Sequence, residues 1–119
     1  MIREPERGEI YFASLGQGVG SEQRGRRPLL VLSIEQMNRA PAELIVAVPL
    51  TTTYRGIRLH VRIEPEESGL PRVSYAMPEM IRNISMERLG PRIGRARIET
   101  VEAAARNAGV LIGLGQTKF

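Results

Sequence analysis

The sequence predicts an α+β domain in which antiparallel strands curl into a small barrel and a helix follows at the C-terminal end. Short runs rich in β-branched and bulky apolar residues, bounded by Gly, Pro, Asn and polar clusters, fill the first three quarters of the chain. From Ile98 onward, apolar residues instead recur at helical spacing. The length of 119 residues allows one compact domain, residues 1–119, and no second core.

Six strands are predicted, at residues 8–14, 28–34, 43–50, 57–64, 72–77 and 91–95. The second and third are nearly continuous apolar runs, which indicates central strands buried on both faces. The fourth alternates apolar residues with Arg58, His60 and Arg62. Because alternate side chains of a strand share a face, we expect this strand to present a basic row to solvent or to a ligand.

The C-terminal helix begins at Ile98, and its apolar positions share one face. Glu99 and Glu102 near its start stabilise it, because the helix dipole is positive at that end. A shorter helical turn is predicted at 85–88, with Ser85 as its N-terminal cap.

The composition excludes several kinds of chemistry. The chain has no Cys, a single His, and thirteen acidic residues that are all Glu. Zinc sites built from Cys or His clusters, disulfides, EF-hand loops and Ser-His-Asp triads are therefore ruled out. We expect no metal site and no cofactor.

Arginine dominates the basic charge: it supplies sixteen of the 17 basic residues, and the net charge is +4. A planar guanidinium binds phosphate through two parallel hydrogen bonds and stacks on bases, which is typical of nucleic-acid partners. Codon usage in a GC-rich genome would also raise the arginine content, so composition alone favours neither explanation.

The chain opens with charged residues, and it has no apolar run of signal-peptide length or of the roughly 18 residues that a membrane span needs. We therefore expect a cytoplasmic protein without membrane contact.

The segment between the first two predicted strands, residues 14–28, is longer than the two to five or so residues that a hairpin needs. It reads SLGQGVGSEQRGRRP, which combines four glycines with polar and charged residues. A loop of this length serves function more often than packing. Its spacing matches neither a Walker loop nor a dinucleotide-binding motif, so it does not predict binding of a nucleoside triphosphate.

Several stretches together resemble the MazF/PemK family of toxin endoribonucleases in order and spacing. The most specific is GSEQRGRRPLLVLS, in which a Ser-Glu-Gln triplet lies between glycines ahead of Arg-Pro and an apolar strand. The others are RGEIYFASLG, Asn38-Arg39, IVAVPLTT, HVRI, and MIRNISMERLG with PRIGR. The resemblance covers nearly the whole chain from Arg7 onward. It implies an SH3-like barrel, a homodimer, metal-independent cleavage of single-stranded RNA, and neutralisation by a small MazE-like antitoxin.

Cleavage by the ribose 2′-OH needs a base, stabilisation of charge on phosphorus, and an acid for the leaving oxygen. Arg27 matches the family's Arg before Pro, and its forked cation suits the phosphorane oxygens. Glu22 matches the acidic residue of the motif and is a candidate base or an orienter of Arg27, although it could simply pin the loop by a salt bridge to Arg24 or Arg26. Thr51 matches the Thr after the third strand and could bind the 2′-OH or the phosphate, with Thr52 as the alternative.

Further residues are expected to bind the RNA. Ser21 and Gln23 would contact base edges or backbone. Glu79 and Arg82 match the second family motif, whereas Met80 stands where some members have Gln, a departure that concerns one base contact. Phosphates would be contacted by the arginines at positions 24, 26, 27, 55, 58 and 62. The predicted RNA-binding set is Ser21, Gln23, Arg24, Arg26, Thr52, Arg58, His60, Glu79 and Arg82.

His60 is expected to face solvent or contact RNA, and a part in catalysis stays open. Two other functions fit a barrel of this kind: a non-enzymatic CcdB-like toxin that binds DNA gyrase, and an RNA-binding barrel without activity. The joint presence of Glu22, Arg27 and Thr51 favours the enzyme, because a gyrase poison has no use for that set.

Overall fold

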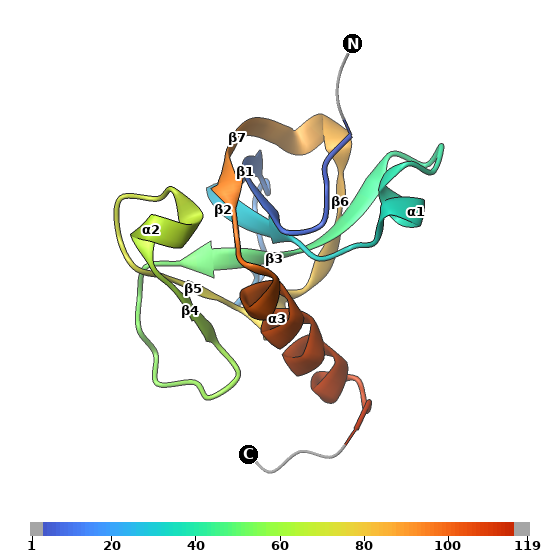
Figure 1. Cartoon of the computed structure of the whole chain (residues 1–119). Coiled ribbons are helices and arrows are strands. Elements are labelled where there is room, and N and C mark those ends of the chain that lie inside the picture. Colours follow the sequence, from blue (N-terminus) through green and yellow to red (C-terminus); the bar gives the residue numbers. More distant parts are fainter. Residues whose placement is uncertain (1–3, 116–119) are drawn as a thin grey trace.

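The computed structural model describes residues 4–115, which form one curled antiparallel sheet with a helix packed against it (Figure 1). The strands are β1 (Glu9–Ser14), β2 (Arg26–Val31), β3 (Leu44–Thr51), β4 (Val61–Ile63), β5 (Ser74–Ala76), β6 (Arg82–Ser85) and β7 (Leu89–Arg95). The helical segments are α1 (Glu35–Asn38), α2 (Pro65–Ser68), η1 (Pro78–Met80), η2 (Met86–Arg88) and α3 (Ile98–Leu111). No helix within this range has the length and apolar character needed to cross a membrane.

Strand β3 is the centre of the sheet. The strand order is β4-β5-β3-β2-β1-β7, and β6 pairs with the first half of β3 while β5 pairs with its end. All the ladders are antiparallel, and the sheet curls into a half-barrel. The nearly continuous apolar run of β3 is buried on both faces, which confirms the sequence prediction.

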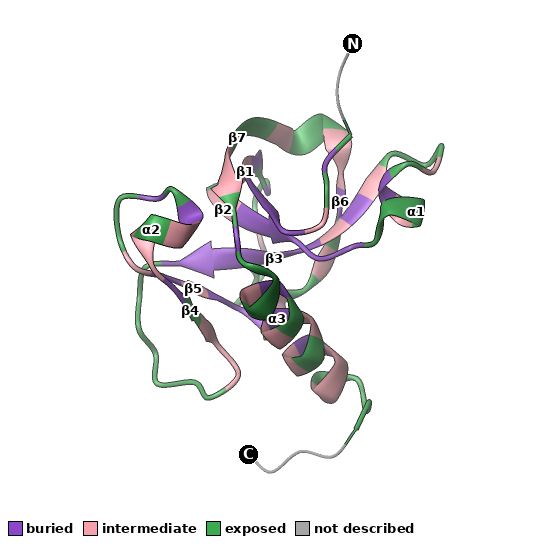
Figure 2. Cartoon of the chain, viewed as in Figure 1, coloured by how far each residue is buried: buried purple, intermediate pink, exposed green. Residues whose placement is uncertain are grey.

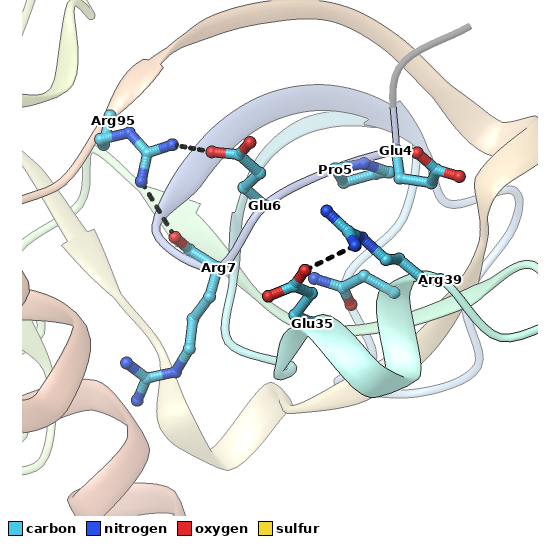
Figure 3. A pocket seen from close by; sticks show the side chains of 8 residues that line it. Glu4, Pro5, Glu6, Arg7, Glu35, Arg39 and Arg95 are labelled. Atoms are coloured by element: carbon cyan, nitrogen blue, oxygen red, sulfur yellow. Dashed lines mark hydrogen bonds and ion pairs between the residues drawn. The ribbon is translucent and has the colours of Figure 1, made fainter.

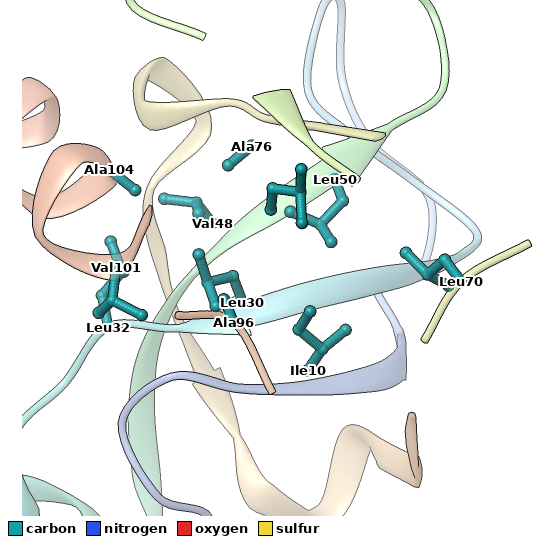
Figure 4. Close-up of a cluster of buried hydrophobic side chains, with 11 residues drawn as sticks. Ile10, Leu30, Leu32, Val48, Leu50, Leu70, Ala76, Ala96, Val101 and Ala104 are labelled. Carbon is teal, nitrogen blue, oxygen red and sulfur yellow. The ribbon is translucent and has the colours of Figure 1, made fainter. Parts of the chain in front are cut away.

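The inner face of the sheet carries the main core, and helix α3 covers it. Val101, Ala104 and Ala108 form the buried stripe of α3, while its outer face is exposed (Figure 2). Val101 and Ala104 pack with Ile10, Leu30, Val48 and Leu50 in the cluster that Figure 4 shows. Full burial of one such aliphatic side chain contributes about 1.5–3 kcal/mol.

The opposite face of the sheet carries a second apolar cluster, formed by Ala13, Leu15, Leu29, Val31, Ile45, Ala47 and Ile84. Successive side chains of a strand point to opposite faces, so β1, β2 and β3 each supply both clusters. The functional site described below lies on this side of the sheet, because polar residues at the ends of β2 and β3 share the face of this second cluster.

The predicted strand at 57–64 is wrong over its first half. Only Val61–Ile63 pairs with a neighbour, because the partner strand β5 is itself three residues long. The preceding residues form a turn, in which His60 N–H donates to Ile57 O at 3.1 Å. Asn107 of α3 holds this turn by donating its amide to Leu59 O at 3.0 Å. The expected basic row on a continuous strand therefore does not form.

Other boundaries also differ from the sequence analysis. The second strand begins two residues earlier than predicted and ends at Val31. The helical turn at 85–88 is confirmed as η2, with the Ser85 hydroxyl accepting Glu87 N–H. Strand β6 was not predicted, because its sequence RNIS lacks an apolar pattern and its pairing with β3 supplies the strand conformation.

Candidate functional site

The β1–β2 loop, residues 15–25, is closed tightly at its base. Leu15 N–H donates to Gly25 O, and Gly25 N–H donates to Gly16 O, each at 2.8 Å. Gly25 has a φ of 75°, a left-handed conformation that side chains other than glycine rarely adopt. These two hydrogen bonds extend the pairing of the hairpin past the ends of β1 and β2, before the two segments separate into the loop.

The tip of the loop is organised by Glu22. Its carboxylate accepts the Val19 N–H at 2.7 Å, and its own N–H donates to Val19 O at 3.1 Å. A side chain at Gly18 would place its Cβ 2.8 Å from Glu22 O, so only glycine permits this close approach. Glu22 thus pins the loop through a backbone N–H, and not through the salt bridge to Arg24 or Arg26 considered from sequence.

A hollow of about 420 Å³, the loop pocket, lies beside this loop. It joins the loop to the segment after β3 and to η1, and it is lined by Gly20, Ser21, Glu22, Gln23, Arg24, Arg27, Arg55, Ile57, Met77, Glu79 and Met80. Within residues 4–115, none of its three arginines forms an ion pair. Its three arginines outnumber the two glutamates of the lining, and a concave site with an excess of positive charge attracts anions such as phosphate.

Arg27 lies at the start of β2, where the strand enters the loop pocket. Its Nε donates to Arg24 O at 3.2 Å, which restrains the guanidinium at the end of the side chain. The β2–β3 register pairs Leu29 with Pro49, and Arg27 and Thr51 each lie two residues further along their own strands, on the same face as that pair. Residues directly opposite each other share a sheet face, which places these two side chains on the same side.

Thr51 ends β3 on this face of the sheet. It is buried, lies opposite Tyr75 of β5, and accepts the Thr53 N–H on its Oγ1 at 3.2 Å. Tyr75 in turn lies opposite Arg62 of β4. The result is a cross-strand row of Thr51, Tyr75 and Arg62 at one end of the sheet, on the face that Arg27 shares.

Arg26 faces the other way. Its guanidinium carbon lies 4.8 Å from the centroid of the Phe12 ring, on the face opposite Arg27, because neighbouring side chains of a strand alternate. The structure therefore does not bring Arg26 into the loop pocket with Arg24 and Arg27.

His60 does not face solvent, so the expectation of a solvent-facing side chain is wrong, whereas a contact with RNA stays a prediction. Its side chain is only 3% exposed, and Nε2 lies 2.7 Å from Oε2 of Glu79 on the rim of the loop pocket. A carboxylate only accepts hydrogen bonds, so Nε2 carries the proton in this contact. The other ring nitrogen, Nδ1, is buried and has no partner among the described residues.

The remaining predicted residues lie around the pocket without lining it. Thr52 is exposed beyond the end of β3, and Arg58 is exposed in the turn before β4. Arg82 of β6 lies opposite Ala47 and so shares the sheet face of Arg27. Sequence analysis did not select Ile57 or Met77, two apolar pocket residues that no local motif marks.

Gln23 is the one loop residue with an unmet polar group at this site. Its side-chain oxygen is buried and has no hydrogen-bond partner within the described part of the chain. Buried acceptors in folded proteins are nearly always satisfied, so a donor on a ligand would complete this site.

A hollow of similar size, about 410 Å³, lies between the N-terminal segment, α1 and β7 (Figure 3). Two of its three arginines are paired: Arg95 with Glu6 at 2.5 Å and Arg39 with Glu35 at 2.8 Å. The third, Arg7, donates to the Leu32 carbonyl, and the three glutamates of the lining equal its arginines in number. The loop pocket is therefore the better site for an anion. Residues 4–115 contain no cluster of three or more side chains arranged to hold a metal ion.

The fold and the site define a curled half-barrel that carries an arginine-lined pocket beside its first hairpin. The family of PemK-like, MazF-like toxins of type II toxin-antitoxin systems matches residues 6–111. Endoribonuclease EndoA of Bacillus subtilis (strain 168) is 37% identical over 89 residues, which cover 74% of this chain and 77% of EndoA. The chain therefore belongs to the PemK-like, MazF-like toxin family.

Solved structures agree with this assignment. MazF (Form-I) from Deinococcus radiodurans superposes with a TM-score of 0.82 at 24% identity, over 95% of this chain and 100% of that one. An endoribonuclease in complex with its cognate antitoxin, from a mycobacterial species, superposes with a TM-score of 0.74 at 26% identity, over 98% and 100%. The half-barrel with a C-terminal helix is thus the fold of MazF.

Proposed function

We propose that this chain is a toxin endoribonuclease that cleaves single-stranded RNA without a metal ion: a ribose 2′-OH attacks the adjacent phosphate, the P–O5′ bond breaks, and the departing 5′-oxygen takes up a proton. The observation that carries the proposal is the loop pocket, in which Arg27, Arg24 and Arg55 meet without ion-pair partners beside Glu22. The EndoA relative is itself named an endoribonuclease. Residues 1–119 act as one domain in this proposal.

Arg27 stabilises the reacting phosphate. In the five-coordinate phosphorane, negative charge grows on the non-bridging oxygens, and a forked guanidinium can donate to two of them. The backbone carbonyl of Arg24 holds the Arg27 Nε at 3.2 Å, so the guanidinium is already oriented before RNA binds.

Glu22 and Thr51 act on the attacking hydroxyl. One Glu22 oxygen accepts the Val19 N–H, which fixes the carboxylate, and the second oxygen can take the 2′-OH proton or orient Arg27. Thr51 accepts the Thr53 N–H and keeps its own hydroxyl proton to donate to the ribose or the phosphate. The buried acceptor of Gln23 would take a donor from a base edge.

The expected partners follow from the same proposal. Ser21, Arg24 and Glu79 bind the RNA around the cut, and a small MazE-like antitoxin neutralises the toxin. The mycobacterial neighbour was solved in complex with its cognate antitoxin. We further propose that the protein is a cytoplasmic homodimer.

Single-turnover cleavage of a long RNA by saturating protein, with EDTA present, tests the proposal. Arg27→Ala should reduce cleavage of bound RNA by on the order of 10²–10³, because it removes charge stabilisation in the transition state. Arg26→Ala is the matched control, since Arg26 lies over Phe12 on the other sheet face. Wild-type protein that leaves every RNA intact would disprove the enzyme; inhibition of gyrase, or RNA binding without cleavage, would then identify the alternative.

A further inference from the structure

A smaller hollow of about 170 Å³, the tyrosine hollow, adjoins the loop pocket. Its walls are Tyr54, Arg55, Ile57, His60, Arg62 and Tyr75. Arg55 and Ile57 line both hollows, so the two form one continuous surface. The sequence predicted RNA contacts by Arg55, His60 and Arg62 but did not select either tyrosine, because only the fold brings the turn before β4 against β5.

The tyrosine hollow concentrates aromatic rings in a chain that has few. The chain has three Tyr and no Trp, and two of those Tyr meet here with ring centroids 5.6 Å apart and planes tilted by 54°. Tyr54 is 73% exposed, so most of its ring surface lies in water and is not buried by the protein. An exposed aromatic face beside arginines is the surface on which single-stranded nucleic acids stack their bases.

Two arginines lie beside these rings, one of them paired with a glutamate. Arg55 is exposed at the boundary with the loop pocket and has no ion pair with any residue in 4–115. Arg62 lies opposite Tyr75, and its Nε donates to Glu64 Oε1 at 2.8 Å, which raises the pKa of this guanidinium above its ordinary value. Arg62 is thus held in an ion pair with Glu64, whereas Arg55 is the arginine of this hollow that forms no ion pair with a described residue.

The cross-strand row connects the tyrosine hollow to the reaction site. Thr51, which we place beside the attacking hydroxyl, lies directly opposite Tyr75. An RNA strand whose cut phosphate lies at Arg27 would therefore bring a neighbouring nucleotide over the tyrosine rings. Arg55, which lines both hollows, would meet the phosphate between them.

We propose that the tyrosine hollow is a base-binding site for one nucleotide next to the cut phosphate, with the base stacked on Tyr54 and Arg55 on the connecting phosphate. This inference rests on the proposed cleavage of RNA and adds a contact that raises affinity for single-stranded substrate. Stacking tolerates every base, because each has a π face. The site therefore strengthens binding at one position without selecting the base there.

The test measures binding to an RNA oligonucleotide around a mapped cut site, with a 2′-deoxy substitution that blocks cleavage. Removal of one base–aromatic stack by alanine substitution weakens binding by about tenfold or more. Tyr54→Ala should do so, while Tyr54→Trp, which keeps a stacking face, should bind like the wild type. Ile34→Ala is the control, because Ile34 is also exposed, at 57%, and lies beside α1 away from both hollows.

Abasic nucleotides identify the position. One abasic substitution next to the cut should weaken binding of the wild type by the same factor as Tyr54→Ala, and should cause no further loss in that variant. Two results would overturn the base site. One is equal affinity of Tyr54→Ala and the wild type for the intact oligonucleotide. The other is a further loss of affinity in Tyr54→Ala for an abasic substitution at every position tested. Failure of the wild type to cut any RNA would overturn the proposed function instead. The base site would then still be supported if one abasic position weakened binding of the wild type and not of Tyr54→Ala, and contradicted if none did.

Discussion

The His60 ring donates from Nε2 to the Glu79 carboxylate at 2.7 Å, and this contact joins the turn before β4 to the rim of the loop pocket. Glu79 lies on η1 and its side chain is 31% exposed, so the buried histidine restrains a carboxylate that would otherwise be free to rotate. A carboxylate held in this way repels phosphate from one side of the pocket and leaves the arginine side open.

His60→Asn should therefore raise KM for RNA by on the order of tenfold and leave kcat within a factor of about two, since charge-assisted hydrogen bonds are worth roughly 1.5–3 kcal/mol. His60→Gln should restore much of the lost affinity, because its terminal amide reaches the position of Nε2. Steady-state kinetics with one oligonucleotide measures both. A variant with Asn that keeps the wild-type KM would show that the contact does not position Glu79.

Thr51 and Thr52 differ in where the fold places them, and this difference predicts which is active. Thr51→Val should slow cleavage of bound RNA by on the order of tenfold, the value of one neutral hydrogen bond of about 0.5–1.5 kcal/mol. Thr51→Ser keeps the hydroxyl and should retain most activity. Thr52→Val should cleave at the wild-type rate, because Thr52 is exposed beyond β3. The reverse result in single-turnover assays would assign the role to Thr52.

RNA binding should weaken steeply with salt, because the pocket arginines displace counterions from phosphates. For single strands the slope of log K against log salt is about −0.7 for each phosphate neutralised, so Arg55→Gln should make the slope shallower by about that amount. Arg39→Gln is the control, since Arg39 already pairs with Glu35 at 2.8 Å on α1. Identical slopes for wild type and Arg55→Gln would exclude a phosphate contact by Arg55.

Gly94→Ala should destabilise the protein without touching the site. A Cβ at Gly94 would lie 2.2 Å from Ser68 O, so α2 could not pack against β7 as it does. Overpacking of this kind costs about 1–3 kcal/mol of unfolding free energy, which urea denaturation would measure. Gly90→Ala on the same strand is the control, because its nearest neighbour would be 3.4 Å away. Equal stability of both variants would mean that α2 shifts freely.

The local pattern of apolar residues was sufficient to predict several elements of the fold. The continuous apolar run of β3 and the helical spacing from Ile98 to Leu111 each predict an element that the structure contains. These elements bury their side chains in the way that their own sequence dictates. Strand β4 shows the limit: residues 57–60 have the alternation of a strand but become a turn, because strand conformation requires a partner and β5 is too short to provide one.

The sequence by itself determined the family resemblance, the long glycine-rich loop, and the choice of Glu22, Arg27 and Thr51 as candidate residues. The tertiary structure alone decided which residues meet. It turned Arg26 onto Phe12, buried His60 against Glu79, and brought Tyr54 and Tyr75 together from segments far apart in the chain. Motifs record residue types along one strand or loop, whereas these contacts depend on strand register and on the curl of the sheet, which only the packing of the whole chain sets.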